Sequence, residues 1–384
     1  MIPGKKWENS NMRLKFFKKP SFGLDISDYS IEIIFLRGNL RNPKLFAMGR
    51  AILEPGIVED GKIINRQVLK KSLSAVIKSP QFGKITTADV IFALPESKTF
   101  LHIFDLPADL EKKKQIPYIE SQASQTFPYP LEELSLDFKI TKNGNDKRVL
   151  LAAVPQKTLN NYQEVFKDLG LNPLSIGMES ESLGRSLIPE QKEPVLILDM
   201  GARTTNFSIF DEGNIRFSYT IEVAGNEISK SLSQNLKISF EEAEEIKQQS
   251  GLNPNPKEGR IFMIIQKEIQ AIIWEIKKIE QYFSQKEEKT FNKIILAGGS
   301  ALLPYLSQYL KVNIEKEVSI GDPWERINID ILRKKDYFPQ ALKINPLIYA
   351  PCIGSALKAL TGNPQKEGIN FLAKHFFHTL SFRL

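Results

Sequence analysis

LILDMGARTTNFSIFDEG, residues 196–213, is the stretch that decides how this chain folds. An apolar run ends at Asp199, a polar turn follows around Gly201, and a second apolar run ends in another turn. This pattern is typical of a β-hairpin. Amides near the glycine and the hydroxyls of Thr204 and Thr205 can donate to phosphate oxygens, and Asp199 can hold Mg2+ or its waters. Taken alone, such a hairpin is more often an ordinary turn with a surface aspartate.

A related hairpin, FGLDISDYSIEIIFLRG, occurs roughly 170 residues earlier in the chain. Asp25 takes the place of the later aspartate, and Ser27 takes the place of the turn glycine. Hydroxyls follow at Tyr29 and Ser30. Two copies of one hairpin predict two related halves, each presenting a polar turn to a shared cleft. Ser27 is the weak point, because serine resists the positive φ that glycine allows.

Length and composition indicate a cytoplasmic protein of two or more domains. The chain has 384 residues, of which 42% are hydrophobic and 25% are charged, an ordinary balance for a globular protein. No uncharged apolar run approaches the roughly 18 residues of a membrane span, and the N-terminus lacks the apolar core of a secretion signal. A single cysteine, Cys352, excludes an internal disulfide, and three histidines do not favour a histidine-based zinc site.

Much of the net charge of +7 is concentrated near the N-terminus. The first twenty residues hold six lysines and arginines against one acid, Glu8, with aromatic residues between them. This composition predicts either a basic amphipathic arm that touches anionic lipid or a solvated, disordered leader. Because the charge is local, it does not indicate nucleic-acid binding.

Two motifs in the second half could flank a ligand. ISFEEAEEIKQQSG predicts a helix with a capping box, on which Glu244 and Lys247 share one face. The usual role of such a pair is a solvated salt bridge. KIILAGGSALLPYL predicts a strand, a turn at Gly298, Gly299 and Ser300, and a helix. A glycine pair there lets a ligand lie against the backbone, and the helix N-terminus favours anionic groups.

Residues 89–155 have the pattern of strand, strand, helix, strand and strand, which predicts a compact α+β insertion into the first half. A proline-bounded segment, IPEQKEP, is the expected linker between the halves. LIYAPCIGSALKAL predicts an apolar helix whose small residues allow close helix packing. The aromatic and basic C-terminus that follows is expected to lie outside the folded core.

In this order the motifs resemble the actin-like ATPase superfamily and, within it, the PilM family of type IV pilus assembly, with the division protein FtsA more distant. The nucleotide side of the resemblance is carried by LDMGARTTNFSIF, ISFEEAEEIK and IILAGGSALL, and the inserted subdomain by LPESKTF, IFDLP and TFPYPLEELSLDF. It covers about residues 21–362. It implies an α/β, actin-like ATPase fold with two duplicated RNase H-like lobes, an α+β insertion in the first and a helical subdomain in the second.

The resemblance also implies a division of the chain. The expected parts are a basic flexible leader at 1–20, a first lobe at 21–88 and 156–192, an inserted α+β subdomain with a partner groove at 89–155, a second lobe at 193–225 and 290–362, a nucleotide-flanking subdomain at 226–289 and a flexible tail at 363–384.

ATP and Mg2+ are the cofactors that the resemblance implies. The implied nucleotide-binding residues are Asp25, Ser27, Tyr29 and Ser30 in the first phosphate loop, Asp199, Gly201, Thr204 and Thr205 in the second, Gly225 at a strand end, Glu244 and Lys247 beside adenine or ribose, and Gly298, Gly299 and Ser300 beneath the adenosine. Magnesium would sit against Asp25 and Asp199, mostly through water. Glu181 is the candidate to orient water for hydrolysis, ahead of Glu179. Because Ser27 and Ala224 stand where many relatives have glycine, we expect slow hydrolysis or none.

The function implied is that of a scaffold at the inner face of the cytoplasmic membrane, peripherally associated with it. Its expected partner is the cytoplasmic N-terminal peptide of a PilN-like inner-membrane protein, with other platform and motor proteins possible and no nucleic acid. Candidate groove residues are Phe92, Leu94, Phe100, Leu101, Ile103 and Phe104.

Other roles remain open at this point. The alternatives are an FtsA-like division protein, a true ATPase or kinase on the same fold, and a type II secretion platform protein. The tail sequence GINFL, residues 368–372, resembles the start of PilN-type peptides. One hypothesis is therefore that the tail occupies the groove of its own or a neighbouring molecule, and chance similarity is the other.

Overall fold

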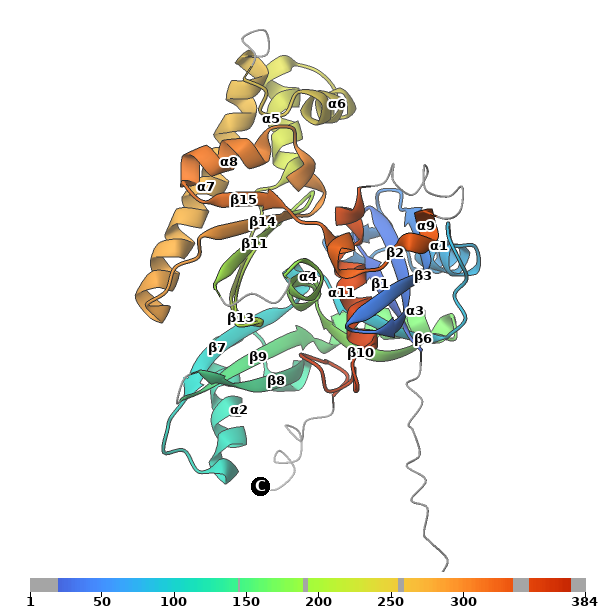
Figure 1. Cartoon of the computed structure of the whole chain (residues 1–384), viewed down its shortest axis with the longest axis vertical. Helices are drawn as coiled ribbons and strands as arrows, with labels where there is room; N and C mark the ends of the chain where they lie inside the picture. Colours follow the sequence, from blue (N-terminus) through green and yellow to red (C-terminus); the bar gives the residue numbers. More distant parts are fainter. Residues whose placement is uncertain (1–19, 144–145, 189–192, 255–258, 334–344, 374–384) are drawn as a thin grey trace, which may run out of the picture.

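Two five-stranded sheets form the centre of the molecule (Figure 1). The computed structural model describes residues 20–143, 146–188, 193–254, 259–333 and 345–373. The first sheet has the order β10-β6-β1-β2-β3 and the second the order β13-β12-β11-β14-β15. The strands of the first sheet are β1 (Phe22–Ile26), β2 (Ser30–Asn39), β3 (Asn42–Ile52), β6 (Asp89–Leu94) and β10 (Asn172–Met178). Those of the second are β11 (Val195–Met200), β12 (Thr205–Asp211), β13 (Asn214–Ile221), β14 (Lys293–Ala297) and β15 (Glu317–Ile320).

The two sheets have the same topology, which confirms the predicted duplication. In each, three consecutive strands pair antiparallel, and two later strands add in parallel beside the first of them. Asp25 is the last residue but one of β1, and Asp199 is the last residue but one of β11. The repeated hairpin therefore places both aspartates at equivalent strand ends.

Helices cover both faces of the first sheet. Its helices are α1 (Arg66–Lys78), α3 (Gln156–Asp168), α4 (Glu179–Leu187) and α11 (Ala350–Ala359), with a short hairpin of β4 (Val58–Glu59) and β5 (Lys62–Ile63). Successive strand residues point to opposite faces. Ile33 accordingly joins the core cluster that includes Leu69 of α1, whereas Ile34 joins the cluster that includes Ala356 of α11.

Helix α11 was predicted in the second lobe, within 290–362, but it packs on the first sheet and on α4. Small residues permit this approach, as its composition predicts. A Cβ on Gly354 would lie 1.8 Å from the carbonyl oxygen of Ser182 in α4, and one on Gly23 of β1 would lie 2.2 Å from that of Cys352. Backbone-to-backbone contact therefore returns the end of the chain to the first lobe.

The insertion begins later than predicted. Its own sheet has the order β7-β9-β8 and carries α2 on one side; the elements are β7 (Phe100–Leu106), α2 (Gln115–Thr126), β8 (Leu134–Asn143) and β9 (Asp146–Pro155). Strand β6, predicted within the insertion from residue 89, instead pairs in parallel with β1 and β10. Phe92 and Leu94 are buried there, so these two predicted groove residues belong to the core.

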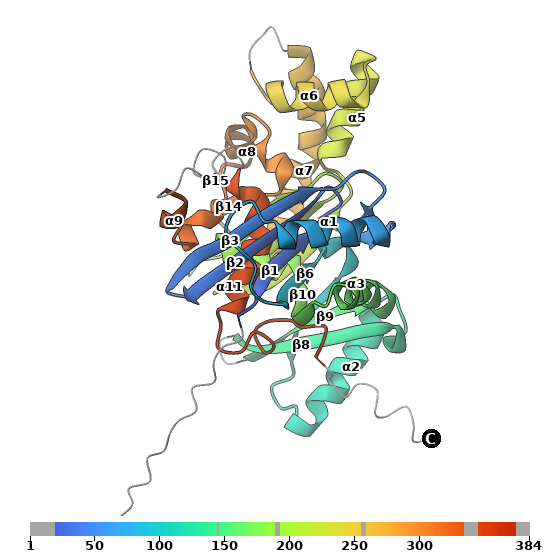
Figure 2. The same ribbon diagram turned by 90° about the vertical axis from the view of Figure 1, so that its right-hand side faces the viewer.

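The helical subdomain and the insertion lie at opposite ends of the molecule (Figure 2). The described helices between residues 225 and 333 are α5 (Gly225–Leu236), α6 (Phe240–Ser250), α7 (Gly259–Glu287), α8 (Leu306–Ile314) and α9 (Asp330–Arg333). The predicted capping box starts α6, because Glu242 N donates to Ser239 Oγ over 3.1 Å and Ser239 N donates to Glu242 Oε2 over 2.9 Å.

The tail prediction is wrong for its first part. Within 363–373, Ile369, Asn370 and Phe371 are at most 4% exposed and are packed against the first lobe. Residues 374–384 and the basic leader up to residue 19 lie outside the described part of the chain. None of the described helices combines the length and the apolar character that a membrane-spanning helix needs.

Candidate functional site

The two predicted aspartates meet at one cavity of about 290 Å³ between the lobes. Burial, followed by the charges of Glu32 and Asp199, raises the pKa of Asp25 well above its ordinary value. Burial, and then the charge of Glu96, raises the pKa of Asp199 to about 7. Carboxylates crowded in this way favour a bound cation, which would offset their repulsion.

The first loop is closed by Ser27 itself. Its backbone amide donates to the carbonyl oxygen of Ser30 over 2.9 Å, and its Oγ accepts from the amides of Ser30 and Tyr29 at 3.1 and 3.3 Å. Ser27 does not adopt a positive φ, so the expected weakness of this position does not arise. Ser27, Tyr29 and Ser30 all line the cavity.

The second loop turns at Gly201, whose amide donates to the carbonyl oxygen of Thr204 over 2.9 Å. Gly201 and Thr204 line the cavity. Thr205 does not, and its prediction as a nucleotide ligand is wrong. It is fully buried in β12, and its Oγ1 donates to the carbonyl oxygen of Val223 over 2.7 Å, because alternate strand residues face opposite sides.

Glycines allow three segments to converge beside Asp199. Gly298 has a φ of +78°, and a Cβ there would lie 2.5 Å from Asp199 Oδ1 and 2.4 Å from the carbonyl oxygen of Met200. A Cβ on Gly225 would lie 2.4 Å from Ser300 Oγ, which donates to the carbonyl oxygen of Gly201 over 2.7 Å. A Cβ on Gly299 would meet no atom within 4 Å, so this residue faces open space. Backbone atoms of the segments around Gly201, Gly225 and Gly298 thus form a glycine cradle beside Asp199.

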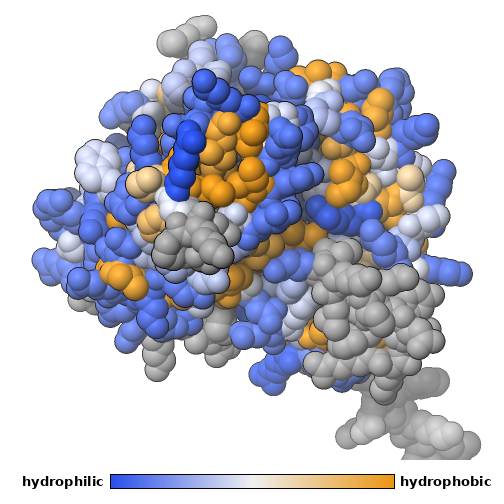
Figure 3. All heavy atoms as spheres, turned by 90° about the horizontal axis from the view of Figure 1, so that it is seen from above, coloured by the Kyte–Doolittle hydropathy of each residue, from blue (hydrophilic) through white to orange (hydrophobic). Residues whose placement is uncertain are grey.

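A second cavity of about 640 Å³ continues from the first and shares Tyr29, Ala202 and Gly299 with it. Its remaining walls are partly apolar, with Ile228, Phe240, Leu302 and Leu303 beside Glu244 and Lys247. The larger volume lies within the range of about 300–1,000 Å³ that holds small ligands, and the smaller one is just below it. Apolar surface on the helical-subdomain end of the molecule gathers in patches among hydrophilic side chains (Figure 3).

Glu244 and Lys247 form a partly buried network and not the solvated pair that their spacing most often means. Lys247 Nζ donates to Glu244 Oε2 over 2.6 Å and to the carbonyl oxygen of Gly225 over 3.1 Å. Ser229 Oγ also donates to Glu244 over 2.6 Å. Burial opposes ionisation of Glu244, but these donors hold its pKa below its ordinary value. The network fixes α6 against the start of α5.

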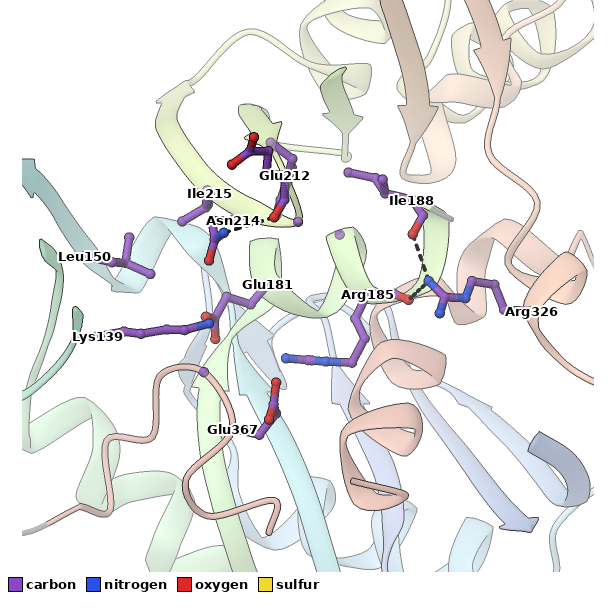
Figure 4. A pocket seen from close by; sticks show the side chains of 14 residues that line it. Lys139, Leu150, Glu181, Arg185, Ile188, Glu212, Asn214, Ile215, Arg326 and Glu367 are labelled. Atoms are coloured by element: carbon purple, nitrogen blue, oxygen red, sulfur yellow. Dashed lines mark hydrogen bonds between the residues drawn. The ribbon is translucent and has the colours of Figure 1, made fainter. Parts of the chain in front are cut away.

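Glu179, not Glu181, lies on the side of α4 that faces the cavity between the lobes. Glu179 lines the smaller cavity, and burial, followed by the charges of Asp199 and Asp25, raises its pKa well above the ordinary value. Positions two apart on a helix point about 200° apart. Glu181 accordingly lines a separate cavity of about 440 Å³ on the other side of α4 (Figure 4). The prediction that Glu181 faces the cavity between the lobes is therefore wrong, and Glu179 is the α4 carboxylate that lines it.

Residues that the sequence did not single out join the lobes across the cleft. Arg203 Nε of the second loop lies 2.7 Å from Asp28 Oδ2 of the first. Glu96 accepts from Ser218 Oγ of β13 over 2.8 Å and from the amide of Ser180 over 3.1 Å. Glu96 is the second residue after the buried strand β6, and a carboxylate near the carboxyl end of a parallel strand was the available signal.

No group of three or more His, Cys, Asp or Glu side chains within the described ranges is arranged to hold a metal ion. Asp25 and Asp199 would therefore need water or phosphate oxygens to complete the shell of a magnesium ion, which keeps several waters in most protein sites. The two carboxylates, the hydroxyl-bearing loops and the glycine cradle fit a magnesium-bound nucleotide, with phosphates in the smaller cavity and a base in the larger.

Comparisons with known proteins agree with this architecture. A family model described as type IV pilus assembly protein PilM matches residues 23–360. A chain of the PilM-PilN type IV pilus biogenesis complex has a TM-score of 0.75 at 20% identity, covering 90% of this chain and 99% of that one. MreB5 of Spiroplasma citri bound to ADP has a TM-score of 0.51 at 14% identity, covering 88% and 96%. These likenesses confirm the predicted actin-like fold.

A relative in sequence is the cell division protein FtsA of Neisseria meningitidis serogroup B. It is 24% identical over 314 residues, which are 74% of this chain and 70% of that protein.

Proposed function

The chain belongs to the PilM family of type IV pilus assembly proteins, and from this premise we propose that it is an ATP-binding scaffold of the pilus assembly platform at the inner face of the cytoplasmic membrane. Its proposed partner is the cytoplasmic N-terminal peptide of a PilN-like inner-membrane protein. The relative in the PilM-PilN complex supports this choice of partner.

The observation that carries the nucleotide part of the proposal is the cradle at the seam of the lobes. Asp25 and Asp199 would hold Mg2+ through water, and Ser27, Tyr29, Ser30, Gly201 and Thr204 would surround the phosphates. Glu244, Lys247, Gly299 and Ser300, which line the larger cavity, would surround the adenosine. Gly298 lines the smaller cavity, and Gly225 lines neither but lets its segment approach Ser300. Bound Mg2+ would neutralise carboxylate and phosphate charge at the seam.

A nucleotide at this place would act as a clamp. The lobes already touch through Arg203 and Asp28, through Glu96 and Ser218, and through Asn226 Nδ2, which donates to Tyr29 Oη over 3.3 Å. A ligand that contacts both phosphate loops adds interactions to only one arrangement of the lobes, and therefore favours it. A scaffold needs this rigidity and does not need turnover, so we propose at most slow hydrolysis.

Calorimetry with Mg-ATP and Mg-ADP tests the nucleotide part, and binding of a synthetic PilN-like N-terminal peptide tests the partner. We expect saturable binding of one nucleotide per chain, and peptide binding that the nucleotide strengthens. Absence of heat with every adenine nucleotide would contradict the first part. Peptide binding that is absent with and without nucleotide would contradict the second.

Glu179→Gln is expected to slow any phosphate release from bound ATP by about 100-fold, because an amide cannot accept a proton from attacking water. Glu181→Gln is expected to leave the release rate unchanged, since Glu181 lies on the opposite side of α4. Single-turnover phosphate release measures both, and nucleotide affinity measured in parallel separates chemistry from binding. The reverse ranking of the two variants would sink the assignment of Glu179.

A further inference from the structure

Residues 365–373 run through a groove between two sheet edges. One wall is β10, the edge strand of the first sheet, and the other is β8, the edge strand of the insertion. Phe371 N donates to the carbonyl oxygen of Ile176 in β10 over 2.8 Å, and Ser135 Oγ of β8 donates to that of Phe371 over 2.7 Å. The C-terminal segment lies beside β10 and β8 in both ribbon views (Figures 1 and 2). We call this space the β8–β10 groove.

Charged side chains from three elements bind the backbone of this segment. Glu181 Oε2 of α4 accepts from the amide of Ile369 over 2.9 Å, and Lys358 Nζ of α11 donates to the carbonyl oxygen of Ile369 over 2.8 Å. Asp137 Oδ2 of β8 accepts from the amide of Asn370 over 2.6 Å. Lys358 and Asp137 are buried, and buried charges require such partners. Charged side chains of the β8–β10 groove thus bind the main chain of Ile369 and Asn370.

The side chains of the segment add selectivity. Asn370 Oδ1 accepts from the amide of Ile176 over 3.1 Å, and Asn370 Nδ2 donates to the carbonyl oxygen of Gln365 over 3.1 Å. Ile369 and Phe371, on either side of it, are buried in the main core cluster. The groove therefore selects an apolar residue, an asparagine and a second apolar residue in succession.

Glycines in both β10 and the segment allow the two backbones to approach closely. A Cβ on Gly177 of β10 would lie 2.9 Å from the carbonyl oxygen of Ile369. Gly368 has a φ of +65°, and a Cβ there would lie 2.7 Å from Glu181 Oε2. Just ahead of Gly368 the groove opens into the cavity of about 440 Å³, where Glu181, Arg185 and Glu367 converge (Figure 4). This cavity leaves room for a longer peptide than the one now in place.

The segment is attached in a way that permits its release. It forms no helix or strand of its own, and residues 362–367, which connect it to α11, are exposed or half-buried. Its contacts with the groove come from residues 368–372. Main-chain bonds to a sheet edge and pockets for side chains are a common means of peptide capture.

We propose that residues 368–372 occupy the β8–β10 groove in cis as a built-in competitor of an apolar–asparagine–apolar peptide that docks there. The proposal deepens the proposed function and rests on it in one respect, namely that the partner's peptide is what displaces the segment. A cis competitor has a high effective concentration, so it lowers the apparent affinity of the groove for peptide in trans.

A labelled peptide with the sequence of residues 364–373, PQKEGINFLA, is the probe. We expect a chain that ends at residue 363 to bind it at least about tenfold more tightly than the full chain does, measured by fluorescence anisotropy. Changing Asn370→Ala in the peptide should abolish binding, whereas Lys366→Ala, at an exposed position, should not change it. A folded, truncated chain that does not bind the probe would overturn the proposal.

A second variant covers failure of the truncated chain to fold. A protease site is inserted in the exposed connection at 362–367, the intact protein is folded and then cut, and exchange of the cut segment for labelled peptide is followed. We expect exchange with the fold retained. A cut segment that never exchanges would show that it is fixed core, and exchange only within dimers would show occupation by a neighbouring copy; both outcomes contradict the cis competitor.

The PilN-like peptide, tested on the same two chains, separates this inference from the proposed function. If it binds neither chain while the probe binds the truncated one, the proposed partner is wrong and the groove assignment stands. If it binds both chains equally, the partner is right and the competitor is wrong. Tighter binding to the truncated chain, by at least about tenfold, supports both.

Discussion

Asp199→Ala is expected to abolish binding of Mg-ATP while the protein stays folded. Asp199 is the last residue but one of β11, lines the cavity between the lobes and carries one of the two carboxylates that can bind the metal's water shell. Its loss should weaken Mg-ATP binding by at least about 100-fold, or about 3 kcal/mol. Isothermal calorimetry measures the affinity, and thermal unfolding measures the fold.

The stability of this variant has a predicted pH dependence. Burial and then the charge of Glu96 raise the pKa of Asp199 from 3.8 to about 7, so the folded chain holds a proton there that the unfolded chain has lost. The contribution of Asp199 to the free energy of unfolding therefore falls as the pH rises between these two values. Without nucleotide, the free energy of unfolding of Asp199→Ala should therefore rise relative to that of the parent as the pH increases from 3.8 to about 7. At neutral pH the variant should be at least as stable as the parent.

The matched control is Asp109→Ala, which removes an exposed aspartate of the insertion. It should leave nucleotide affinity and stability unchanged. Affinity retained within about threefold in Asp199→Ala would contradict the site, since a metal-binding carboxylate is worth more than the roughly 0.7 kcal/mol that this ratio represents.

Gly354→Ala is expected to produce the largest loss of stability. A Cβ at Gly354 would lie 1.8 Å from the carbonyl oxygen of Ser182, and 2.5 Å from its carbonyl carbon. Both atoms belong to the backbone of α4, so no flexible side chain can move aside, and α4 and α11 must separate. We expect the free energy of unfolding to fall by about 3 kcal/mol or more. Urea-induced unfolding measures the change.

Gly362→Ala is the control for this change. A Cβ at Gly362 meets no atom within 4 Å, and its φ lies outside the positive range. Its effect should stay within about 0.5 kcal/mol. If the two variants are equally stable, α11 does not pack on α4 through Gly354, and the return of the chain to the first lobe is wrong.

The sequence alone determined the features that depend on local order. The repeated hairpin predicted duplicated lobes and placed Asp25 and Asp199 at equivalent strand ends. The spacing in ISFEEAEEIK predicted a capping box, and the small residues around Gly354 predicted close helix packing. These predictions held because the periodicity of a strand or helix, and the chemistry of a cap, are set by residues a few positions apart.

Only the tertiary structure decided which side chain faces the site. Whether Glu179 or Glu181 enters the cleft depends on where α4 starts, and whether Thr204 or Thr205 does depends on the register of β12. A shift of one residue reverses the facing of every strand residue and turns every helix residue by about 100°.

The tertiary structure also decided the pairings between distant parts of the chain. Strand β6 joins the first sheet through parallel neighbours that are far away in sequence. Residues 369–371 are buried by Ser135, Ile176 and Glu181, all of which lie near the middle of the chain. No local pattern encodes such contacts, because they form only when separately folded elements pack together and bury their shared surface.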